Sequence, residues 1–393
     1  MVTFLQLMIL FSIILFLMGQ NKRAAKVFVI SILITMFLFP KNSIEAAKNG
    51  FNLWIYVVAP SLFPFFILND IVISLEIPDN ISKLFKHFFR KLLNTSGYGA
   101  YVFIMSIFTG YPTGAKIVAQ LISEKKISSY EGQKILNFAS TSGPLFVIGA
   151  VGIGMFNNIK VGYILFVSHI LGAIINGLIL NNFFYPKSNV AESCWLNKDK
   201  NTNKNFLTKS ILNSLTTTGI IGGYIIFFSV LIELIYKLNI FNKIEWLLDL
   251  FLNKSLSKSI ILGLQGAVEI TNGCNLISKA NIPFFLKILI STFIISFSGI
   301  SIIMQVFSIT YESKISIKAY VISKISHSTF SLLVALLILN FISIDSETFM
   351  VEPNIPYFIN LFPLLEILLT IILILNLIYF IKVNIFERKY SDC

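Results

Sequence analysis

The stretch "SIFTGYPTGAKIVAQLISEKK", from Ser106 to Lys126, is mostly apolar but cannot form an ordinary membrane helix. Gly110, Pro112 and Gly114 fall within five positions, and a charge cluster ends the run soon afterwards. Glycine and proline interrupt helices and leave backbone groups without partners. We therefore expect the chain to enter the membrane here, turn near Gly110 and return to the side from which it came.

The composition of the whole chain also indicates a membrane protein. Of its 393 residues, 55% are hydrophobic and 13% are charged, which is too little charge to cover a soluble domain of this size. Apolar runs such as 211–235 and 326–341 are at or near the length that crosses a hydrocarbon core. The sequence predicts an all-α polytopic protein of the cell membrane, with the lipid bilayer as a partner.

The net charge of +12 comes mainly from lysines in short loops between apolar runs. Positive loops mark the cytoplasmic side of a membrane, so this pattern does not predict nucleic-acid binding. The three cysteines and three histidines are scattered along the chain. We expect no metal site, no disulfide framework and no cofactor.

Several segments outside the central region have their own character. A transmembrane hairpin is predicted over 1–40, with its basic turn at 20–26 in the cytoplasm. The segment 79–97 mixes basic and apolar residues at helical spacing, which predicts an amphipathic helix on the cytoplasmic face. A polar cytoplasmic linker follows at 186–209, and a last spanning helix at 357–383 places the C-terminus in the cytoplasm.

Two regions, 47–185 and 210–343, carry the same order of features. The predicted hairpin turns and helix breaks lie at Gly110, Pro112, Gly114, Gly143, Pro144, Gly266, Gly273 and Gly299. Gly110 and Gly143 are 33 positions apart, as are Gly266 and Gly299. We interpret the regions as repeats of three spanning helices plus one re-entrant helical hairpin. An odd number of crossings makes this an inverted repeat, with extra N- and C-terminal spanning helices.

The charges set the expected topology. The basic loops at 76–97, 123–134 and 186–209 can all be cytoplasmic only if 99–122 returns to its side of entry. Four lysines between 237 and 258 fall outside in this arrangement, against the rule, and three acidic residues partly balance them.

Glu269 is the acidic residue within the apolar run 259–280. A carboxylate at membrane depth is costly and normally faces a cavity or a partner. It could bind a cation, accept a proton or pair with Lys116, or it could lie at the interface near a hairpin mouth. Lys116 could either face substrate or extend to the cytoplasmic surface.

Other polar side chains gather beside the predicted helix breaks. They are the hydroxyls of Thr141, Ser142, Ser298 and Ser301 and the amides of Asn272, Asn275 and Gln305. Each alone is typical of contacts between membrane helices. Together they make the repeat interface the most polar part of the membrane core, where we expect a site for substrate or ion.

Four blocks of sequence resemble a known family. They are "SLFPFF" (61–66), "TGYPTGAKIV" (109–118), "TSGPLFVIGAVGIGMF" (141–156) and "FSGISIIMQVFSI" (297–309). In this order they resemble the YlbJ family of sporulation integral membrane proteins, within the nucleoside-recognition, or Gate domain, superfamily. The resemblance covers about 47–343. It implies a spore-forming bacterium, a role in forming the spore cortex, and other sporulation membrane proteins as partners.

The hairpin and broken-helix repeat is similar, more distantly, to concentrative nucleoside transporters and to gate segments of the iron transporter FeoB. The chain departs from both. It has no GTPase domain, and the residues that bind nucleoside and sodium are not clearly matched around Gly266–Gly273. Whether nucleosides bind stays open.

These patterns favour a transporter-like protein that moves a small polar solute, with a coupling cation as a further partner. The alternative is a membrane scaffold or gate that does not transport and partners another sporulation protein. A continuous polar path would indicate the first, and an interface sealed by phenylalanine the second. Catalytic motifs and paired carboxylates are missing from the sequence, so we expect no enzyme.

Overall fold

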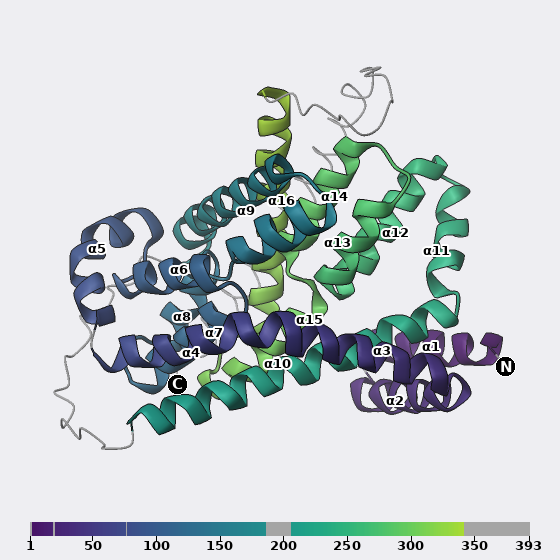
Figure 1. The fold of residues 1–393 in the computed structure, drawn as a ribbon, viewed down its shortest axis with the longest axis horizontal. Coiled ribbons are helices and arrows are strands. Elements are labelled where there is room, and N and C mark those ends of the chain that lie inside the picture. Colours follow the sequence, from purple (N-terminus) through teal and green to yellow (C-terminus); the bar gives the residue numbers. More distant parts are fainter. Residues whose placement is uncertain (1, 19, 76, 186–205, 342–393) are drawn as a thin grey trace. The chain divides into compact units, whose positions relative to one another are not determined.

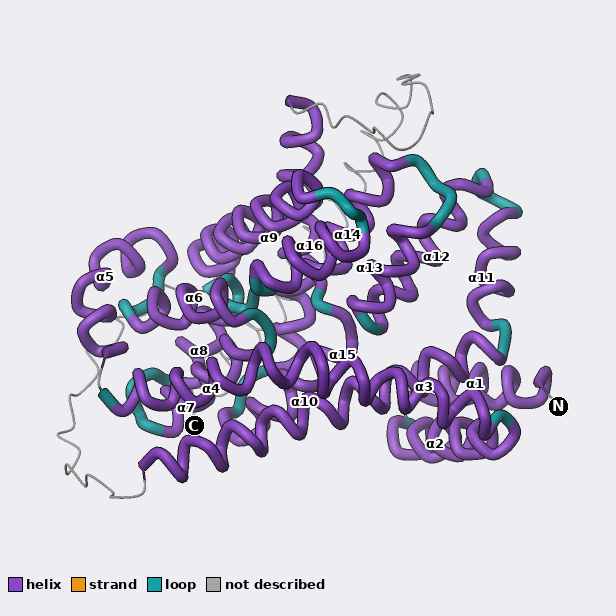
Figure 2. Tube along the Cα trace, viewed as in Figure 1, coloured by secondary structure: helices purple, strands orange, loops and turns teal. Residues whose placement is uncertain are grey.

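The computed structural model describes residues 2–18, 20–75, 77–185 and 206–341, and the regular structure of this part of the chain is helical (Figure 2). The chain divides into two compact units. Unit 1 comprises Met1–Ile77, Lys198–Ile294 and Ser298–Ile309, and unit 2 comprises Pro78–Asn197, Ile295–Phe297 and Thr310–Cys393. Each unit therefore contains elements of both predicted repeats.

Unit 1 is built around long helices (Figure 1). Its elements are α1 (Val2–Leu17), α2 (Asn21–Leu38), α3 (Pro40–Leu53), the π-helical turn η1 (Trp54–Val58), α4 (Ala59–Ser74), α10 (Phe206–Lys237), α11 (Ile240–Asp249), α12 (Lys254–Val268), α13 (Ile270–Lys279), most of α14 (Phe284–Phe297) and most of α15 (Gly299–Thr310). α10 packs along α3 and α4, and α12 packs against α13.

The contact between α10 and the α3–α4 arm depends on small residues. A Cβ on Gly222 would lie 2.4 Å from the Trp54 ring, and a Cβ on Gly50 would lie 2.8 Å from Ser229 Oγ. The Trp54 indole Nε1–H donates to the Thr218 carbonyl at 3.0 Å. Close backbone approach of this kind is how helices associate where lipid removes the hydrophobic driving force.

Unit 2 holds the opening stretch of the sequence. Its elements are α5 (Ile77–Leu93), α6 (Tyr98–Thr109), α7 (Thr113–Ser123), α8 (Ser129–Leu136), the π-helix η2 (Leu145–Met155), α9 (Ile159–Ile179), the π-helical turn η3 (Leu180–Phe184), the 3₁₀ turn η4 (Tyr311–Ser313) and α16 (Ile317–Phe341). α9 and α16 lie side by side (Figure 1). Gly172 allows this contact, because a Cβ there would lie 2.1 Å from Ser331 Oγ.

Four helices of the described chain are long and apolar enough to cross a membrane: Ile159–Phe184, Leu207–Lys237, Phe284–Ser313 and Ile317–Asn340. Asn21–Leu38 and Pro40–Tyr56 form a further pair, bent by 103°. These helices fit the predicted all-α polytopic class. The inverted order of the repeats stays a prediction.

Some of the observed helices were predicted from the sequence and others were not. The amphipathic segment expected at 79–97 is α5, which buries Phe89 and Leu93 and exposes Leu84 and Phe88. The short helix α11 was not anticipated from the sequence. The predicted helix at 357–383 and nearly all of the linker at 186–209 lie outside the described residues.

Candidate functional site

The first hairpin, α6 and α7, is too short to cross a membrane with either arm. α6 has 12 residues and a length of about 18 Å, against about 30 Å of hydrocarbon. The turn is at Gly110, where φ is +80° and a Cβ would lie 2.7 Å from the backbone nitrogen of Gly143. Gly114 is equally confined, since its Cβ would lie 1.9 Å from the Ala139 carbonyl oxygen. Both glycines are needed for this turn to pack.

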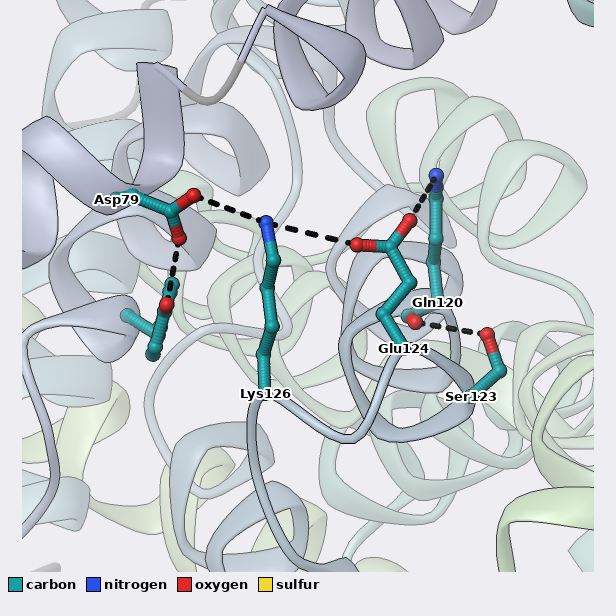
Figure 3. A network of polar contacts seen from close by, with 6 residues as sticks. Asp79, Gln120, Ser123, Glu124 and Lys126 are labelled. Atoms are coloured by element: carbon teal, nitrogen blue, oxygen red, sulfur yellow. Dashed lines mark hydrogen bonds and ion pairs between the residues drawn. The ribbon is translucent and has the colours of Figure 1, made fainter. Parts of the chain in front are cut away.

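The other end of this hairpin is polar (Figure 3). Asp79 of α5 accepts from the Tyr98 hydroxyl at 2.5 Å and from Lys126 Nζ at 3.2 Å. Lys126 also lies 3.5 Å from a Glu124 carboxylate oxygen. Tyr98 begins α6 and Lys126 follows α7, so both ends of the hairpin meet at one charged cluster, opposite its glycine turn.

The first helix break is the non-helical stretch 140–143, between α8 and η2. Thr141 is tied to α6, because its Oγ1 lies 2.9 Å from Ser106 Oγ and its N–H donates to the same oxygen at 3.0 Å. The hydroxyls thus satisfy backbone groups that the break leaves free. The turn of the α6–α7 hairpin, which we call hairpin 1, is in contact with this helix break through Gly110 and Gly143.

A buried lysine of α16 lies where these parts meet. Lys324 is 1% exposed, and its ammonium nitrogen has three acceptors. These are Tyr111 Oη at 2.7 Å, the Ser140 carbonyl at 3.0 Å and His327 Nδ1 at 3.1 Å. Nζ also lies 4.7 Å from the centroid of the Tyr111 ring. We call Lys324, Tyr111, Ser140, His327 and His169 the Lys324 network.

Hydrogen bonding fixes the histidine tautomers in this network. His169 Nε2 accepts from the Ser142 N–H at 2.8 Å, so its Nδ1 carries the proton and donates to Ser296 Oγ at 2.9 Å. His327 Nε2 lies 2.9 Å from the His169 carbonyl, which can only accept, so this nitrogen is the protonated one. His327 Nδ1 therefore presents a lone pair to Lys324.

The network contains no negative charge to balance the lysine. Lys324 forms no ion pair with a carboxylate among the described residues. Removing a charge from water costs several kcal/mol even after relaxation. A lysine in this position is expensive, which is typical of a functional group within a membrane.

The two histidines occupy equivalent places. Each stands ten residues after the first residue of its helix, in α9 and α16, and each follows a buried serine, Ser168 or Ser326. Their ring centroids are 4.8 Å apart. The dipeptide Ser-His thus recurs on both helices of a packed pair.

A second buried lysine lies on α8. Lys134 is 1% exposed, with its Nζ 5.6 Å from the Tyr130 ring centroid. Burial lowers the pKa of Lys134 to about 8, and the nearby Glu131 carboxylate opposes this shift.

The second hairpin, formed by α12 and α13 and called hairpin 2, has a turn that is stabilised by a carboxylate side chain. Glu269 separates the helices and caps α13, with its carboxylate accepting the N–H groups of Thr271 at 3.0 Å and Asn272 at 2.8 Å. Gly266 and Gly273 do not form the turn, although the sequence predicted a turn or helix break at both glycines. They lie inside α12 and α13, where a Cβ on Gly273 would come 2.2 Å from Gly266 Cα.

The second helix break, between α14 and α15, lies in unit 1 at Ser298 and Gly299, whose φ angles are +73° and +74°. A Cβ on Gly299 would lie 3.4 Å from the Val268 carbonyl oxygen, at the end of α12. The Ser298 hydroxyl is buried and has no hydrogen-bond partner within the described residues. As in unit 2, a hairpin turn lies against a broken helix.

The predicted site residues therefore fall into two sets. Unit 1 contains Glu269, Asn272, Asn275, Ser298, Ser301 and Gln305, and unit 2 contains Lys116, Thr141 and Ser142. Within unit 1, Gln305 donates to Ser301 Oγ at 3.4 Å, and the Asn275 carbonyl accepts from Ser278. Lys116 is half-buried on α7. Ser142 reaches the Lys324 network through His169.

Sequence reasoning missed Lys324, Tyr111 and the pairing of the histidines, although signals were present. Lys324 is the charged residue of the run 319–341, and Glu269 is the acidic residue of the run 259–280. The motif Ser-x-Ser-Gly occurs at 140–143 and again at 296–299. These matches were available from the sequence, but only the fold brings the residues into contact.

The apolar helices, the two short hairpins and the buried polar network together define a polytopic helical membrane protein. The chain is 32% identical over 327 residues to the sporulation integral membrane protein YlbJ of Bacillus subtilis (strain 168), across 77% of this chain and 79% of that relative. The chain belongs to the YlbJ family of sporulation integral membrane proteins. No family model and no solved structure matches it.

Proposed function

We propose that the chain is a transporter-like membrane protein that moves a small polar solute during spore formation and is needed for the spore cortex. Sporulation comes from the name of its relative in Bacillus subtilis. The observation that carries the transport proposal is the Lys324 network, a buried lysine without a carboxylate partner among the described residues, where a hairpin turn meets a helix break. Such junctions are where secondary transporters bind their ligands.

The proposal includes an inverted repeat of the Gate domain type. Support comes from helices that would be equivalent in the two repeats and are packed in pairs, α4 with α10 in unit 1 and α9 with α16 in unit 2. His169 and His327 face each other at one such pair. Elements related by a two-fold axis meet in this way beside the axis.

The proposal also makes α6–α7 a re-entrant hairpin entering from the cytoplasm. Lys91 precedes the hairpin on α5 and Lys125 follows α7, and both are exposed. Cysteines at the two positions should react with the same impermeant reagent from the same side of the bilayer. Labelling from opposite sides would contradict both the re-entrant hairpin and the inverted repeat.

The scaffold or gate without transport remains the second candidate, and one observation favours it. All three N–H groups of a protonated Lys324 already have protein acceptors, so none is free for a solute in this arrangement. A protein that only holds its partner would keep the network closed.

Complementation distinguishes the two candidates. The chain is expressed in a Bacillus subtilis strain that lacks its own YlbJ, and small solutes are profiled in mother cell and forespore. Transport predicts that at least one pool is shifted in the deletion strain and restored by the chain. Restored spores with every solute pool unchanged by the deletion would favour the scaffold.

Variants of the candidate residues refine the same assay. Lys324→Met should abolish complementation, whereas Lys318→Met, an exposed lysine on the same helix, should not. If Glu269 binds an ion or a proton, Glu269→Gln should insert normally but fail to support sporulation. Normal sporulation with Glu269→Gln would leave Glu269 with its capping role alone.

A further inference from the structure

We propose that Lys324 and His327 form a proton-binding site, which takes up one proton when unit 2 opens to water and releases it on closing. The inference deepens the proposed function by naming the proton as the coupling ion. Only this coupling role rests on the proposal that the protein transports a solute. A gate that passes no solute would be controlled by the same site.

The geometry of the pair limits it to one proton. His327 Nε2–H is committed to the His169 carbonyl, so the Nδ1 lone pair faces Lys324 Nζ at 3.1 Å. Two nitrogen bases at this distance can share one proton, as ammonium with imidazole or as amine with imidazolium. A second proton would leave N–H groups on both sides of the contact with no acceptor between them.

The surrounding titratable groups do not compensate the charge of the pair. His169, on α9, keeps Nε2 free of a proton because that atom accepts from the Ser142 N–H. Tyr111 faces Nζ from the turn of hairpin 1, and Tyr320, on α16 itself, bonds Ser140 Oγ at 2.7 Å. Both phenols are neutral near pH 7. Among the described residues no carboxylate pairs with Lys324, so the shared proton sets the charge of the network.

Two opposing costs determine which conformation binds the proton. With the pair neutral, the amine has two N–H groups for three acceptors, and one acceptor goes unmatched. With the pair protonated, all three are matched, but a cation is buried without a counter-charge. The second cost is larger, because desolvating a charge outweighs one neutral hydrogen bond. Proton loss therefore favours the closed network, and proton uptake favours an arrangement in which water reaches Nζ.

The turn of hairpin 1 is the element that must respond. Tyr111 lies between Gly110 and Pro112, and its hydroxyl both accepts from Lys324 and donates to the Ile295 carbonyl at 3.3 Å. Hydrating Nζ requires this cover to move. In the step itself one O–H bond of hydronium breaks and one N–H bond forms, leaving water, and the reverse transfer to water occurs when the network closes.

Hydrogen–deuterium exchange of the full chain in lipid nanodiscs tests the proposal. Exchange is followed in peptides covering 106–116 from pH 5.5 to 9.5, after correction for the intrinsic pH dependence of exchange. Opening should become less frequent as pH rises, by at most about tenfold per pH unit, the limit for one proton. Lys324→Met should stay protected at every pH, and Lys324→Arg, which keeps its charge, should stay open.

Lys318→Met is the matched control and should keep the wild-type pH profile. The proposal is overturned if the wild-type turn shows no pH dependence, if Lys324→Met keeps it, or if the slope exceeds that of one proton. If Lys324→Met does not fold, the flat profile of Lys324→Arg still decides the question. Shifted solute pools without any pH effect would refute the proton site alone, whereas a pH effect with unchanged pools would refute transport alone.

Discussion

The two hairpins have the same outline but satisfy their turns by different chemistry. In hairpin 1, glycine backbone packs against the helix break, and Tyr111 reaches a lysine on another helix. In hairpin 2, Glu269 caps the helix that follows it, and the arms meet through Gly266 and Gly273. The turn of hairpin 1 depends on residues distant in the sequence, whereas the turn of hairpin 2 depends mainly on its own sequence. We therefore expect the first turn to have a regulatory role and the second a structural one.

The largest effect is expected at the first turn. Gly110→Ala places a side chain at a φ of +80°, with its Cβ 2.7 Å from Gly143 nitrogen. Left-handed strain and overpacking together should cost about 2–5 kcal/mol, enough to prevent folding. Yield and monodispersity in detergent measure this. Gly149→Ala, which meets no atom within 4 Å, is the control and should express normally.

Hairpin 2 should be sensitive along its arms rather than at its turn. Gly273→Ala brings a Cβ within 2.2 Å of Gly266 Cα and should destabilise the protein by about 1–3 kcal/mol through overpacking. Thermal unfolding in detergent measures the loss. Gly263→Ala, with its nearest contact at 3.6 Å, should leave the melting temperature unchanged, and equal effects would contradict this packing.

Unit 2 should also respond to alkaline pH through Lys134. Its pKa of about 8 lies below the unfolded value of 10.5, so between these values the unfolded chain binds more protons and stability rises with pH. The gain should be about 3 kcal/mol across the window, since each pKa unit corresponds to about 1.4 kcal/mol. The difference in melting temperature between the wild type and Lys134→Met, measured as a function of pH, isolates the contribution of Lys134. A difference that does not change with pH would contradict the burial of the ammonium.

The smallest effect is expected at the turn of hairpin 2. Glu269→Ala removes a helix cap and should cost about 1 kcal/mol, while Glu269→Gln should cost less because its amide oxygen still accepts. Melting temperatures of the two variants give the ranking. If Glu269→Gln is as stable as the wild type but inactive in sporulation, Glu269 has a functional role. The turns of both hairpins would then be functional, and the proposed contrast between them would be wrong.

Local sequence predicted the helical elements well where one physical rule decided them. Gly110 ends α6 because only glycine fits its φ and its close neighbour, and the break at Ser298–Gly299 falls where we expected a helix to be interrupted. Gly266 was misplaced because a glycine inside a helix contact and a glycine at a turn look alike in sequence. The role of Glu269 depends on an atomic detail, the two N–H groups it caps, which spacing does not reveal.

By itself, the sequence determined that this chain belongs in a membrane, where its long helices run and where they break, since hydrophobicity and backbone geometry are local properties. Tertiary structure alone decided which polar side chains meet. Tyr111, His169 and Lys324 are separated by more than 50 residues along the chain, and only the packing of α9 with α16 and the folding back of hairpin 1 bring them together. Their chemistry depends on distances and tautomers that the order of residues cannot specify.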